Sequence, residues 1–104
     1  MLISSFTESG LAYAPLQVTE TSPAGYTDAI MRDSFKQTVV HSPVAVTIQV
    51  SLIHTPDEES DADWVNLAEN TKFFAFEHPV RWLRLKGLPE GETAYILSIE
   101  PKYE

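Results

Sequence analysis

The densest group of side chains able to do chemistry is the acidic run "DEESDAD" at residues 57–63. Calcium is bound by about six to eight oxygen ligands, and several carboxylates in one loop can supply part of such a set. The spacing does not match an EF-hand loop, because no glycine stands at the turn that this loop requires. A solvated acidic loop is the simpler interpretation. A cation site is the alternative, and its ligands would be Asp57, Glu59, Asp61 and Asp63.

Other catalytic patterns are missing from the sequence. His41, His54 and His78 show neither His-x-His nor His-Glu-x-x-His spacing, no serine lies in a Gly-x-Ser-x-Gly motif, and there is no cysteine. The glycines are scattered, so no loop of the kind that cradles a phosphate is present. We therefore predict a protein that is not an enzyme and needs no cofactor and no metal.

Charge argues against two classes of partner. Fifteen acidic residues against seven basic ones give a net charge of −8, which would be repelled by nucleic-acid phosphates. No basic cluster offsets this balance locally, and no apolar run reaches the roughly 20 residues needed to span a bilayer. We expect neither nucleic acid nor a membrane to be a partner.

The sequence predicts that the elements positioning the acidic loop and the other candidate side chains are short β-strands separated by turns. In residues 44–54, "VAVTIQVSLIH", apolar and polar side chains alternate, as in a strand with one buried face. Residues 34–41 precede it across a Ser-Pro step, which predicts an antiparallel hairpin. Further strands are expected within 12–20, 62–67, 71–76, 79–87 and 93–101, and Pro15 should confine the first of these to a sheet edge.

Evidence for helix is weak, and residues 21–33 read as a long connection with at most one helical turn. About seven strands without a covering helix must bury their faces against one another. We predict an all-β fold, a two-layer antiparallel β-sandwich that is jelly-roll-like. Residues 1–104 should form one domain, with 1–13 as a candidate N-terminal arm.

The second half of the chain carries apolar side chains on both faces of its strands. If Leu83 and Leu85 point into a core, Trp82 must point the other way beside Arg84. Such a face needs a cover, which the arm, the long connection or another subunit would provide. Aromatic residues and arginine are enriched at protein interfaces. We therefore predict a protein–protein interface formed by Phe73, Trp82, Arg84 and Ile96.

The cadence of residues 44–100 resembles β-sandwich modules of tailed-phage structural proteins. It consists of a strand of alternating valines, then "WVNL", "TKFFAF", "PVRWLRLKGL" and a closing strand after a glycine-containing turn. It is also similar to galactose-binding-like jelly rolls. The phage resemblance implies a virion component, either a capsid decoration or cement protein or a head or tail accessory subunit. Such a component would be a homo-oligomer docked on a phage capsid or tail protein.

The jelly-roll resemblance implies a rival function, carbohydrate binding. In that interpretation the 55–64 loop would hold the sugar, with Trp64 as a stacking platform and the carboxylates as hydroxyl or ion ligands. Trp64 also belongs to the predicted strand that contains Val65 and Leu67, and packing inside the protein would explain a tryptophan there equally well. Both interpretations stay open at this point.

Overall fold

The chain is all-β in the computed structural model, which describes residues 2–3, 11–20, 22–31, 37–77 and 80–99. No helix occurs in these ranges, so none there is long and apolar enough to cross a membrane. The strands are β1 (Leu2–Ile3), β2 (Leu11–Leu16), β3 (Ala29–Met31), β4 (Gln37–Ser51), β5 (Val65–Phe76), β6 (Trp82–Lys86) and β7 (Ala94–Ile99). The predicted all-β class is confirmed.

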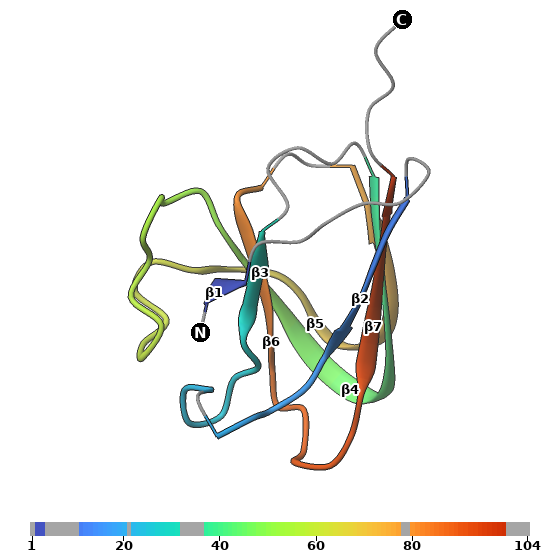
Figure 1. The fold of residues 1–104 in the computed structure, drawn as a ribbon, viewed down its shortest axis with the longest axis horizontal. Coiled ribbons are helices and arrows are strands. Elements are labelled where there is room, and N and C mark those ends of the chain that lie inside the picture. The colour runs from blue at the N-terminus through green and yellow to red at the C-terminus, as the bar shows by residue number, and fades with distance from the viewer. Residues whose placement is uncertain (1, 4–10, 21, 32–36, 78–79, 100–104) are drawn as a thin grey trace, which may run out of the picture.

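Strand β4 is the centre of the sheet. Antiparallel β5 pairs with it from Thr38 to Val50. The other partners divide its length, since β7 pairs with Gln37–His41 and β6 with Thr47–Ser51. Beyond these, β3 and β1 follow β6, and β2 follows β7, so one sheet of seven strands results. Figure 1 shows this sheet curled around its interior like a half-barrel.

The predicted hairpin across the Ser-Pro step is wrong, because β4 runs through it without reversing. The buried Ser42 hydroxyl donates to the Val44 carbonyl at 2.6 Å and accepts from the Val44 N–H at 3.3 Å. These local bonds replace ladder bonds where the pairing with β5 is interrupted, between His41 and Val46. The step therefore makes an irregularity inside a long strand, and the reversal comes later, after Ser51.

The strands expected at 62–67 and 71–76 are likewise one strand, β5. Asn70 in its middle has a left-handed φ of 51°. Asparagine tolerates this conformation better than most residues, and it lets the strand change register without ending.

The main core lies on the inner face of the curled sheet. Val46, Ile48 and Val50 from β4 meet Leu83 and Leu85 from β6, as the expected parities place them. The single buried face expected for residues 44–54 is wrong at the end of the strand, because Gln49 and Ser51 on the polar side are buried and Leu52 is 73% exposed. The far end of the sheet faces the same core through a second group of buried residues, namely Leu16, Val40, Phe76, Ala94 and Ile96. Curling thus lets the two ends of one sheet bury each other.

The described parts of the candidate arm, 1–13, are strands of the sheet. Leu2–Ile3 pairs in parallel with β3, and β2 pairs with β7. Pro15 lies in β2, the outermost strand on that side, as its missing N–H requires. The long connection at 21–33 contains β3, and its described residues contain no helical turn.

Candidate functional site

The loop at residues 52–64, between β4 and β5, folds over the outer face of β6 and is held there by Arg84. This guanidinium has no exposed surface, and it donates to backbone carbonyls of the loop, to Glu58 O at 2.7 Å and to Ser60 O at 2.8 Å. Its Nε donates to Gln49 Oε1 at 2.8 Å, and Asp61 lies 3.6 Å away as an ion-pair partner. A buried cation is tolerated only when it is paired and hydrogen-bonded in this way.

Aromatic rings complete this cluster, which we call the Arg84 clamp: Tyr26, Gln49, Asp61, Trp64 and Arg84. The guanidinium carbon lies 3.7 Å from the Tyr26 ring centroid and 4.1 Å from that of Trp64. Planar guanidinium stacks well on such faces. The Trp64 indole N–H donates to Asp57 O at 2.8 Å, which closes the loop upon itself. The clamp therefore fixes the position of a loop that has no regular secondary structure.

Asp61 carries the negative charge of the clamp. Its Oδ1 accepts from Gln49 at 2.9 Å and from the Tyr26 hydroxyl at 2.7 Å, and its Oδ2 accepts from Lys86 at 2.9 Å. The hydrogen bond from Gln49, followed by those from Tyr26 and Lys86, lowers the pKa of Asp61 well below its ordinary value. The hydrogen bond that each of them donates to Asp61 raises the pKa of the Tyr26 hydroxyl and the pKa of the Lys86 ammonium group.

The stabilising effect of Asp61 should depend on pH. Because folding lowers its pKa, its contribution is complete above the pKa of an unfolded aspartate, about 4, and is lost as pH falls through the lower folded value. We expect Asp61→Asn to lower the free energy of unfolding by a constant amount above about pH 5, and we expect this difference from wild type to become smaller below about pH 4. Urea unfolding of both proteins across this pH range measures the difference in free energy. A difference that does not change with pH would contradict the role given to Asp61.

In the predicted cation or sugar loop, two carboxylates accept hydrogen bonds from backbone N–H groups of the loop itself. The Asp63 carboxylate accepts from the Asp57 N–H at 2.7 Å, and Asp57 accepts from the Glu59 N–H at 2.9 Å. No group of three or more His, Asp or Glu side chains able to hold a metal occurs among the described residues. Trp64 is only 7% exposed and its ring lies against Arg84, although it also lines the apolar groove beside the loop. Its role as a stacking platform for a sugar stays a prediction.

The predicted interface residues separate into two groups. Phe73 is 62% exposed, whereas Trp82, Arg84 and Ile96 are buried within the chain at 6%, 0% and 0%. Trp82 donates its indole N–H to His54 O at 3.0 Å, and Ile96 lies in the main core. These three have no appreciable surface left for a partner, which corrects the expectation for them. The cover is the 52–64 loop, a candidate that the sequence analysis did not include.

The two histidines among the described residues, His41 and His54, are not brought together by the fold. His41 is exposed on β4, with its ring 6.4 Å from that of Phe73. His54 lies in the loop, where its Nδ1 is 2.7 Å from Nη1 of Arg81. His78 lies outside the described residues.

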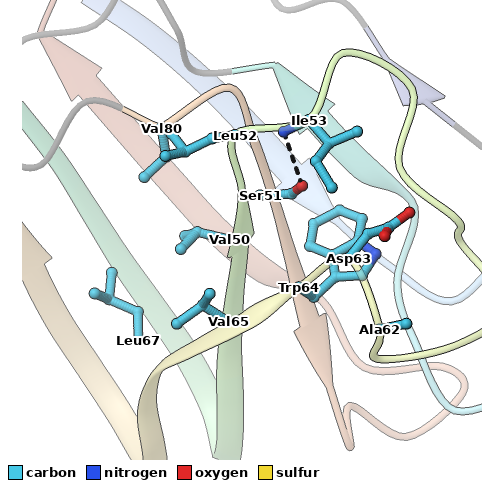
Figure 2. Close-up of a pocket in the computed structure, with 10 residues that line it drawn as sticks. All are labelled: Val50, Ser51, Leu52, Ile53, Ala62, Asp63, Trp64, Val65, Leu67 and Val80. Atoms are coloured by element: carbon cyan, nitrogen blue, oxygen red, sulfur yellow. Dashed lines mark hydrogen bonds between the residues drawn. The ribbon is translucent and has the colours of Figure 1, made fainter.

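An apolar groove opens beside the clamped loop, with a volume of about 560 Å3 (Figure 2). Val50 and Val80 line it from the edge of the core, and Leu52, Ile53 and Val65 stand at its margin. These last three are 73%, 45% and 65% exposed. The Ile53 N–H donates to the buried Ser51 hydroxyl at 3.2 Å, so the backbone that presents them is anchored. Large aliphatic side chains gathered in this way suit contact with another apolar surface.

Comparison with known proteins adds no relative to this description: no family model, no curated protein and no solved structure matches the chain.

Proposed function

We propose that this chain is a non-enzymatic assembly protein that uses the apolar groove to bind another protein subunit. The observation that carries the proposal is the exposure of Leu52, Ile53 and Val65 around a groove of about 560 Å3. The occupant would be an aliphatic side chain and its neighbours on the partner. Burying these side chains removes apolar surface from water at both partners.

Rigidity of the loop supports this function. An exposed loop normally loses conformational entropy when a partner orders it, and this loss weakens binding. Here the Arg84 clamp holds the loop before any partner arrives, through bonds to the carbonyls of Glu58 and Ser60. The groove is thus presented in a formed state.

The biological context we propose is the virion of a tailed phage, on the basis of the strand cadence at residues 44–100. The chain would be a capsid decoration or cement protein, or a head or tail accessory subunit, working as a homo-oligomer. A jelly-roll-like two-layer sandwich is part of this proposal. It is supported by the way both ends of the curled sheet contribute to one core. Many copies on a symmetric lattice would gain avidity without further contacts.

Co-sedimentation with expanded tailed-phage capsids tests the function. Leu52→Asp and Val65→Asp place a charge in the groove and should each weaken binding about tenfold or more. Thr55→Asp is the matched control, because Thr55 is exposed on the same loop and does not line the groove. Its binding should stay within about twofold of wild type. Absence of wild-type binding, or equal binding by all variants, would overturn the proposal.

A further inference from the structure

A second apolar surface lies on the outer face of the other half of the sheet, where β5, β4, β7 and β2 run side by side (Figure 1). Cross-strand pairing places Phe73, His41 and Tyr95 in one row, because His41 is opposite both of its neighbours. The next row holds Ala75, Val39 and Leu97 for the same reason. Directly opposite residues share a face of the sheet. We call these six residues the aromatic face.

The aromatic face is exposed to solvent. Phe73, Tyr95 and Leu97 are 62%, 40% and 41% exposed, and Ala75 and His41 are also exposed. On the other half of the sheet the outer face is covered, since the loop packs over Trp82 and Arg84. Among the described residues, the two halves of the sheet therefore differ: the 52–64 loop packs over the outer face of one half, and the outward side chains of the other half are largely exposed.

The aromatic face also carries no Asp, Glu, Lys or Arg, although these make up 21% of the chain. The neutral surface continues along the outward positions of β4 through Pro43 and Ala45, both exposed, and reaches Pro15 of β2, which is opposite Tyr95. A chain with a net charge of −8 thus has no charged side chain in this part of the outer sheet face. Such a face suits contact with a surface that is itself uncharged.

We propose that the aromatic face binds the aromatic face of a second copy of this chain, about a two-fold axis parallel to β4. The proposal rests on the proposed assembly function and adds the surface through which copies join. Such an axis exchanges the β5 and β7 sides of the face, so Phe73 of each copy lies opposite Tyr95 of the other. Aromatic pairs of this kind are favoured contacts. A two-fold contact requires one self-complementary patch, which this surface provides.

The available area agrees with a pair of subunits. Large side chains present about 200 Å2 each, so Phe73, Tyr95 and Leu97 alone expose roughly 300 Å2. This is more than a third of the about 800 Å2 that each partner buries in a stable complex. The neutral neighbours Pro15, Pro43 and Ala45 extend the surface around that centre.

Salt dependence distinguishes a second copy from a basic partner. Two copies that each carry −8 repel one another at long range, and their uncharged contact has no ion pairs to lose. Self-association should therefore strengthen as salt rises from about 0.05 to 0.5 M. Binding of a cationic partner would weaken over the same range.

Sedimentation velocity and native mass spectrometry of the full chain test the proposal. Wild type should form dimers below about 1 mM, and Phe73→Asp and Leu97→Asp should each weaken dimerisation by at least tenfold. Thr55→Asp is the control, since it adds the same charge at an exposed residue outside both the groove and the aromatic face and should leave dimerisation unchanged. Far-ultraviolet circular dichroism and urea unfolding establish whether each variant is folded. If Leu97→Asp does not fold, the milder replacement Leu97→Ser takes its place.

Each result decides between the two proposals. A wild-type chain that stays monomeric at about 1 mM in low and high salt overturns the aromatic-face dimer, whether or not capsids are bound. Dimerisation that survives both face variants, or that is lost in Thr55→Asp, overturns it as well. Loss of dimerisation in the face variants with normal dimerisation of Thr55→Asp supports it, even if no capsid binding is found. Capsid binding that depends on Leu52 in a monomeric chain supports the groove alone.

Discussion

Arg84→Ala is expected to lower the free energy of unfolding by about 4 kcal/mol, which would lower the melting temperature by roughly 20 °C. The guanidinium is fully buried and holds Gln49, Glu58 and Ser60 through hydrogen bonds of 2.7–2.8 Å. Its removal leaves these acceptors without their donor and empties the space between two aromatic rings. Urea unfolding followed by circular dichroism measures the change.

Fluorescence localises the effect of Arg84→Ala. Both tryptophans of the chain are buried, Trp64 as the last residue of the loop and Trp82 beneath it, so release of the loop should shift their emission to longer wavelength. Arg84→Lys is the control, because it keeps the charge but cannot form the forked hydrogen bonds to two carbonyls. Its stability and its emission wavelength should lie between those of wild type and Arg84→Ala. Unchanged stability and emission in Arg84→Ala would refute the clamp.

Trp82→Ala should destabilise the fold by about 3–5 kcal/mol, because it removes a large side chain that is only 6% exposed. Trp82 packs with Ala29 and Trp64 in a small cluster under the loop, and its N–H holds the His54 carbonyl. Trp82→Phe retains most of the packing and loses only the hydrogen bond, so we expect about 1 kcal/mol. Urea midpoints with unchanged slopes would show that both act on stability.

Phe73→Ala is the matched control for the aromatic replacement. Phe73 is 62% exposed, so its loss should cost less than about 1 kcal/mol in an isolated subunit. If Trp82→Ala is as stable as Phe73→Ala but defective in assembly, Trp82 contributes to an interface between subunits. That outcome would contradict its role in packing inside the chain.

Local pattern was enough to predict the class of fold and many side-chain directions. Alternation along residues 44–50 placed Val46, Ile48 and Val50 inside, and the opposed parities of Leu83 and Trp82 showed that β6 buries both faces. These features depend on the two-residue period of a strand, which is written directly in the sequence.

Strand boundaries were less predictable. The Ser42–Pro43 step and Asn70 look like turns, because proline, serine and asparagine are frequent in turns. In the fold they are irregularities within β4 and β5, which pair with each other on both sides of the interruption. Local propensity could not distinguish the two outcomes, since the difference lies in which partner strand is present beyond the step.

By itself, the sequence determined that the chain is all-β, that it is acidic, and that β6 must be covered on its outer face. Only the tertiary structure decided what covers it. Arg84 lies 24 or more residues from the carbonyls it holds at Ser60 and Glu58, and Gln49 lies on the polar side of its strand, where it gave no sign of burial. Contacts across such separations form only when the strands have paired, because the pairing brings the loop and β6 together. Side-chain periodicity is a property of one strand, whereas the clamp is a property of how several strands and a loop meet.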